Sequence, residues 1–191
     1  SMEQKTGDTA VPATTTAVPA NVALAKRIVE EVFALDLEES LSGLELLATK
    51  TLAPLPEPQH AELEPLFKAL WEYFRGVELM RQGDFSQTAE YFERSANAFD
   101  RFGFSELRDL SIGMHAYSQA VLMLRQLNFG QALDYFAKVK SFLTNAGRFS
   151  SRYQSMIEHM EPEALVAAGA QQLMALDFAN AKVLLDRAGL T

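Results

Sequence analysis

Apolar residues recur at spacings of three and four along most of this chain, which is the pattern of one buried face on an amphipathic helix. Between Ala61 and Gln82 these positions are Leu66, Phe67, Leu70, Trp71, Phe74, Val77 and Met80. The pattern predicts eight main helices, in residues 20–34, 37–52, 60–82, 85–101, 105–127 and 130–145, in a segment from about residue 149 that Pro162 kinks or splits, and in residues 179–188. We therefore predict an all-α fold.

A six-residue phrase is repeated four times, each time where one predicted helix ends and the next begins. Its copies start at Leu35, Gly83, Leu127 and Leu176, at intervals of 48, 44 and 49 residues. Each copy has Asp or Asn in second place, a large apolar residue in third place and a small residue in sixth place. The acidic or amide side chain can cap the helix that follows, because it accepts from the free amides of the first turn. Each copy thus predicts the turn of a helical hairpin.

Small side chains recur where the two helices of each hairpin would touch. The sixth residues of the phrase are Ser40, Thr88, Ala132 and Ala181. Four positions later the chain places large residues, which are Leu44, Phe92, Phe136 and Leu185. Twelve positions before the sixth residue, on the first helix, stand Ile28, Gly76, Ala120 and Gly169. We expect close antiparallel helix pairs, each burying its apolar face on the next.

The second copy, Gly83-Asp84-Phe85 with Gly76 before it and Phe92 after it, resembles the signature of the tetratricopeptide repeat (TPR). The third copy is similar through Ala120, Ala132 and Phe136, and the fourth through Gly169, Ala181, Leu185 and Ala188. The resemblance covers about residues 21–189 and implies a TPR-like α-solenoid of about four antiparallel helix hairpins. The standard repeat has about 34 residues. Longer helices or an inserted turn must absorb the additional length in this chain.

Composition limits the domain organisation and the partners. The first twenty residues are rich in Thr, Ala, Pro and Val without helical periodicity, and Ser1 before Met2 is typical of a remnant of a cleaved expression tag. We expect residues 1–20 to be a disordered lead-in and residues 21–191 to form a single TPR-like domain. A formal net charge of −8 with no run of Lys or Arg argues against nucleic acid as the main ligand. No apolar run is long enough to cross a membrane, and the absence of cysteine fits a cytoplasmic protein.

No arrangement typical of catalysis is present in the sequence. We find no Gly-rich phosphate loop, no nucleophile elbow and no His-Glu-x-x-His motif. The three histidines, His60, His115 and His159, are far apart and none has a second ligand at helical spacing, so we expect no metal site. The prediction is a protein that is not an enzyme and carries no cofactor.

The best candidate site lies on the first helices of the two middle hairpins. Alignment of the phrase pairs Tyr73 with Tyr117, Val77 with Val121, and Arg81 with Arg125. The resemblance implies that these positions line a concave groove. Tyr offers a large apolar body with a polar tip, and Arg can grip a carboxylate with two hydrogen bonds. Such a groove suits a peptide or protein segment with apolar and acidic side chains. Core packing is the alternative interpretation of the same residues.

Three hypotheses for function follow. The leading one is a non-enzymatic protein-interaction scaffold that binds a peptide or protein segment in its concave groove. The second is a sensory or regulatory module that binds a small molecule between hairpins and controls a fused effector domain. The third is self-association, since Val183, Leu184 and Leu185 make the last predicted helix apolar. That helix would either make a homo-oligomer through the terminal hairpin or continue into further chain.

Overall fold

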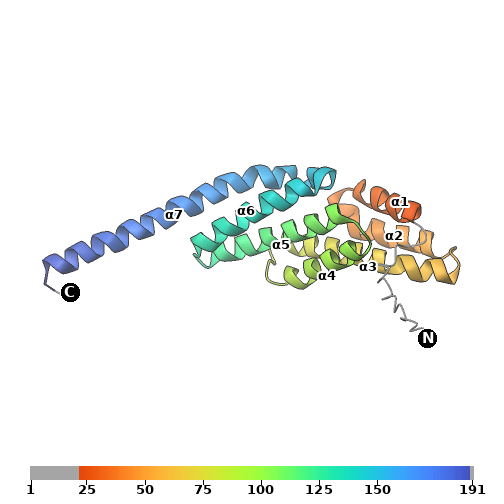
Figure 1. Ribbon diagram of the computed structural model, residues 1–191, viewed down its shortest axis with the longest axis horizontal. Coiled ribbons are helices and arrows are strands. Elements are labelled where there is room, and N and C mark those ends of the chain that lie inside the picture. Colours follow the sequence, from red (N-terminus) through yellow and green to blue (C-terminus); the bar gives the residue numbers. More distant parts are fainter. Residues whose placement is uncertain (1–21, 190–191) are drawn as a thin grey trace, which may run out of the picture.

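The computed structural model describes residues 22–189, and over that range the chain is helical and contains no strand (Figure 1). Its elements are α1 (Val22–Phe33), the short 3₁₀ helix η1 (Leu37–Glu39), α2 (Ser40–Leu52), α3 (Glu57–Arg81), α4 (Thr88–Arg101), α5 (Ser105–Arg125), α6 (Phe129–Asn145), the 3₁₀ helix η2 (Gly147–Tyr153) and α7 (Gln154–Arg187). The predicted all-α fold is confirmed. The predicted lead-in, residues 1–20, lies outside the described residues.

Three copies of the phrase form the turns of helical hairpins. In the second copy Gly83 has a left-handed backbone (φ 82°), and the amide of Asp84 donates to the carbonyl of Leu79 at 2.9 Å. In the third copy Leu127 takes the same conformation (φ 58°), and Asn128 donates to Met123 at 2.8 Å. A left-handed residue after the last helical turn lets these amides satisfy carbonyls that the helix leaves free. The phrase therefore ends α3 and α5 in the same way.

The second residue of the phrase then starts the next helix. The side chain of Asn128 accepts from the amide of Gln131 at 3.4 Å, and Asp84 accepts from the amide of Gln87 at the same distance. The capping role predicted for Asp84 is thus present, although regular helix α4 begins only at Thr88. Acceptors at these positions satisfy the free amides of the first turn.

Small and large residues meet between the paired helices as the pattern predicts. Ser40, Thr88 and Ala132 are all buried, as are Leu44, Phe92 and Phe136. Gly76 on α3 lies against the ring of Phe92 on α4, so closely that a β-carbon on Gly76 would stand 2.9 Å from Cζ. The short side chains let the helices approach, and the large ones fill the space beside the contact.

The fourth predicted hairpin does not form. Helix α7 runs without a break from Gln154 to Arg187 and passes through both Pro162 and the fourth copy of the phrase. A proline removes one backbone donor, and here the helix continues on both sides of it. Ala181 and Leu185 are exposed, and nothing lies within 4 Å of a β-carbon built on Gly169. Figure 1 shows the second half of α7 extending away from the other helices.

The first hairpin also contacts η2, more than 100 residues later in the chain. The rings of Phe33 and Phe149 pack edge to face with centroids 5.1 Å apart. Arg152 donates to the carbonyl of Leu35 at 2.5 Å and to the hydroxyl of Ser40 at 3.3 Å. This junction brings η2 and the start of α7 beside η1, α3 and α5, and so closes one side of a groove.

None of the helices in residues 22–189 combines the length and the apolarity that a membrane span requires.

Candidate functional site

A groove of about 470 Å³ lies between α3, α5 and the η2–α7 segment, with η1 at one edge. We call it the inner groove. Its apolar wall consists of Leu37, Val77, Met80, Phe85, Met114 and Met156. Its polar groups come from Arg81, Tyr117, Arg152, Tyr153, Ser155, His159 and Glu163. Met80 and Met156 give the wall a flexible surface that can adapt to the shape of a bound group, while Met114 is buried.

The structure brings three of the six predicted site residues together. Val77 and Arg81 on α3 and Tyr117 on α5 all line the inner groove. Val121 and Arg125, one and two turns further along α5, are not among its lining residues. No aligned pair lines the groove together, since Val77 and Arg81 line it without their counterparts on α5, and Tyr117 lines it without Tyr73.

Tyr73 must be corrected from a groove residue to a core residue. Its side chain has 0% exposure, and its hydroxyl donates to the hydroxyl of Tyr153 at 2.5 Å. Burial raises the pKa of Tyr73 well above its ordinary value and that of Tyr153 to about 12, so both phenols are neutral. A side chain without solvent exposure cannot contact a ligand in an open groove. Tyr73 instead holds η2 against α3.

The two predicted arginines recur for a structural reason. Arg81 donates to the carbonyl of Leu37 at 3.2 Å, and Arg125 donates to the carbonyl of Gly83 at 3.1 Å. In each case the acceptor belongs to the turn of the preceding hairpin. Arg125 also stacks over the ring of Phe85 at 4.7 Å. Both arginines therefore join successive hairpins, and Arg81 alone also borders the inner groove.

Glu163 on α7 is a groove residue with a buried polar atom that has no partner in the described part of the chain. Its Oε2 is buried and has no hydrogen-bond partner among the described residues. Burial raises the pKa of Glu163 above its ordinary value, and His159, one turn before it, acts in the opposite direction. Burial likewise raises the pKa of Tyr117 across the groove. A ligand that donates a hydrogen bond to Glu163 would satisfy an acceptor that the folded chain leaves open.

Glu163 should make stability fall as the pH rises. Folding raises the pKa of this carboxyl above its value in the unfolded chain, which is near 4.5. The stability that the carboxyl contributes is therefore complete at a pH below the unfolded pKa, and it is lost as the pH rises through the folded pKa. Glu163→Gln stays neutral at every pH. We expect this variant to unfold at a higher urea concentration than the natural chain at pH 7, with the difference shrinking at pH 4. A difference independent of pH would show that the carboxyl does not titrate as its burial indicates.

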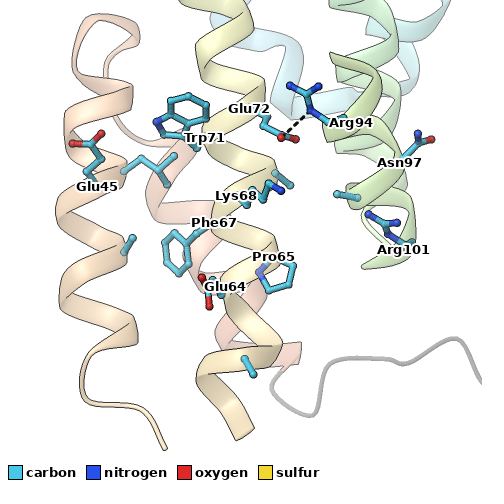
Figure 2. Close-up of a pocket in the computed structure, with 15 residues that line it drawn as sticks. Glu45, Glu64, Pro65, Phe67, Lys68, Trp71, Glu72, Arg94, Asn97 and Arg101 are labelled. Atoms are coloured by element: carbon cyan, nitrogen blue, oxygen red, sulfur yellow. Dashed lines mark hydrogen bonds and ion pairs between the residues drawn. The ribbon is translucent and has the colours of Figure 1, made fainter. Parts of the chain in front are cut away.

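A second cleft, of about 830 Å³, lies between α2, α3 and α4 (Figure 2). Arg94 reaches from α4 to Glu72 on α3, and its Nε donates to Oε1 at 3.0 Å. Trp71 borders the cleft from α3 and packs its ring against Tyr91. The carboxylate of Glu72 is mostly buried but already paired, as buried charges generally are. This cleft is the larger one, yet its buried charge does not require a ligand.

Sequence reasoning missed the contribution of α7 to the inner groove. Met156, His159 and Glu163 are three and four residues apart and so share one face of the helix. That spacing was visible in the sequence, where His159 was considered only as a possible metal ligand. No signal in the sequence indicated that η2 would turn this face toward α3 and α5. Burial of His115, outside the groove, lowers its pKa.

The fold and the groove together define an all-helical protein of consecutive hairpins with one groove shared by α3, α5 and α7. Comparison of the chain with family models, with curated proteins and with solved structures finds no match. Within residues 22–189 no group of three acidic, His or Cys side chains is placed to hold a metal ion.

Proposed function

We propose that this domain is a non-enzymatic, TPR-like helical-repeat module that binds a segment of another protein in the inner groove. The observation that carries the proposal is the groove itself. It is built by α3 and α5 together with α7, and most of its lining surface is apolar. Stacked hairpins provide such elongated surfaces, and extended or helical peptides commonly dock in them.

The groove's chemistry favours a segment with apolar and acidic side chains. Met80 and Met156 can pack around an apolar side chain and rearrange to fit it. Arg81 and Arg152 border the same space. One Nη of Arg152 is buried without a partner among the described residues, so it can still donate to an acceptor. These two cations make the groove locally favourable for a carboxylate, although the formal net charge of the chain is −8.

The alternative is a small-molecule sensor that uses the same groove. Its volume of about 470 Å³ falls within the usual range of ligand sites, which is about 300–1,000 Å³. The open acceptor on Glu163 favours a compact ligand with a hydrogen-bond donor. A thermal shift with a metabolite that is abolished by Glu163→Gln would support the sensor. Peptide binding that survives this substitution would support the scaffold.

The scaffold proposal predicts different effects for two similar arginines. Both Arg81 and Arg125 anchor a preceding turn, but only Arg81 borders the groove. Peptides selected from a displayed library on the natural chain should combine apolar and acidic residues. Their affinity should fall about tenfold or more in Arg81→Glu, because central arginines are common binding hot spots. Fluorescence anisotropy with a labelled peptide measures the change.

Arg125→Glu is the matched control. It removes an equivalent hairpin anchor and reverses the same charge, so any general loss of stability is shared by the two variants. We expect peptide affinity in Arg125→Glu to stay within about threefold of the natural chain, as for surface charges outside an interface. Equal losses in both variants, or selected peptides without acidic residues, would count against the inner groove as the binding site.

A further inference from the structure

The second half of α7 carries an apolar stripe that no described residue covers. Phe178 is 74% exposed, Met174 45% and Leu185 44%, and Ala181 is exposed as well. These four residues are spaced by four, three and four positions, so they lie on one face of the helix. Leu173 and Leu184 flank them and are also exposed. We call Met174, Phe178, Ala181 and Leu185 the α7 stripe.

The α7 stripe continues a face that the same helix buries further back. In the first half of α7, Met160 and Ala167 are buried, and each lies close to a whole number of helical turns from a residue of the stripe. The contact between α7 and α6 ends near the start of α6, where the side chain of Gln171 lies 3.3 Å from a β-carbon built on Gly130. Beyond that point α7 runs on alone, as Figure 1 shows. One amphipathic face is therefore packed over half of its length and bare over the rest.

The stripe is complementary to itself when two copies run antiparallel. Phe178 and Ala181 are equally distant from a point between residues 179 and 180, and so are Met174 and Leu185. A twofold axis at that point sets Phe178 of each copy opposite Ala181 of the other copy. It also sets Met174 opposite Leu185 of the second copy. Large side chains then face small ones at the centre, which is the arrangement that close helix pairs require.

We propose that the α7 stripe is a self-association surface, and that its partner is the same stripe of a second copy of this chain in antiparallel orientation. The charged residues nearest the centre, Asp177 and Lys182, lie on either side of the stripe and remain in solvent. A single helix pair is small for a stable interface, so the dimer forms in a concentration-dependent way. A fold-back of residues 179–188 onto α7 would instead require the unbroken helix to open at Leu176.

The natural chain has no cysteine, so single cysteines can map the pairing without interference. Ala181→Cys places a thiol in the stripe, close to the twofold axis, and should yield a disulfide-linked dimer on mild oxidation. Ala179→Cys is the matched control, since it changes the same residue type two positions away on the opposite face of the helix. It should stay monomeric on a non-reducing gel. Equal cross-linking of the two variants, or none in Ala181→Cys, would overturn the proposal.

Ala188→Cys tests the direction of the pair. In the antiparallel arrangement the two thiols of this variant would be separated by about 26 Å along the axis, from about 17 residues at about 1.5 Å each. They should not cross-link, and efficient cross-linking there would indicate a parallel pair and contradict the proposal. Light scattering of the natural chain should show a mass that rises from monomer to dimer with concentration. Phe178→Asp should abolish that rise with unchanged circular dichroism, and a natural chain that stays monomeric would overturn the inference.

Discussion

Replacing Phe92 with alanine should lower the free energy of unfolding by about 3–5 kcal/mol, the usual cost of emptying a buried aromatic site. The ring has 0% exposure and lies with its centroid 5.8 Å from that of Tyr73. Gly76 on α3 lies against the ring and has no side chain that could move into the cavity. Because Gly76 cannot fill the space, the loss should fall in the upper part of the range. Urea unfolding followed by circular dichroism measures the change.

Leu46→Ala provides the control for that experiment. Leu46 is on α2 and is 73% exposed, so its replacement should change stability by no more than about 0.5 kcal/mol. A compensating substitution sharpens the test. Gly76→Ala alone should destabilise the chain, because its β-carbon would stand 2.9 Å from Cζ of Phe92. In the Phe92→Ala background the same change should be harmless or stabilising, since contacting residues are not additive. Additive effects would contradict the contact.

The hairpin turns could be predicted because their chemistry is local. Asp84 and Asn128 accept from amides three residues ahead, and Thr88 and Ala132 are small where helices touch. Every one of these features is visible in six consecutive residues. The same phrase at Leu176 led to a wrong prediction, because α7 continues through it. Local chemistry allows a turn there but does not require one.

The comparison of Leu127 with Leu176 shows what decides the outcome. Both residues are leucines in first place of the phrase, yet Leu127 is left-handed (φ 58°) and Leu176 is helical. The left-handed conformation costs a non-glycine residue roughly 1–2 kcal/mol. At Leu127 the turn lets α6 bury Ala132 and Phe136. Nothing within the phrase itself reports whether such burial follows, so the sequence could not separate the two cases.

The repeat pattern can predict site residues only where the aligned faces of two helices have the same neighbours in the folded protein. Tyr73 and Tyr117 occupy the same place in their hairpins, but Tyr73 is buried while Tyr117 borders the inner groove. The difference arises because Phe33 and Tyr153 cover Tyr73. These contacts join segments 40 and 80 residues away from Tyr73 in the chain, and no periodic pattern indicates them. The same long-range junction adds Glu163 to the groove.

Arg152 is the residue on which that junction depends most. Its guanidinium donates to Leu35 and Ser40 in the first hairpin and lies over the rings of Phe33 and Phe74, at 5.5 and 5.3 Å. Arg152→Ala removes both hydrogen bonds and leaves a carbonyl without its charged donor. Hydrogen bonds that involve a charged group contribute about 1.5–3 kcal/mol, so we expect a loss of about 2–3 kcal/mol in the free energy of unfolding. Arg152→Lys should recover only part of this stability, because one ammonium group cannot reproduce the planar set of donors on a guanidinium.

Arg148→Ala is the matched control for this prediction, since Arg148 spans the same junction from η2 to Glu30 on α1. That pair is exposed to solvent, so its loss should cost less than about 1 kcal/mol. Amide hydrogen exchange locates the effect. Arg152→Ala should speed exchange in α1 and η2 while α5 and α6 keep their protection, because the first hairpin would detach before the rest unfolds. Equal losses of stability in the two variants, or faster exchange spread over the whole chain, would mean that Arg152 does not hold the first hairpin against η2.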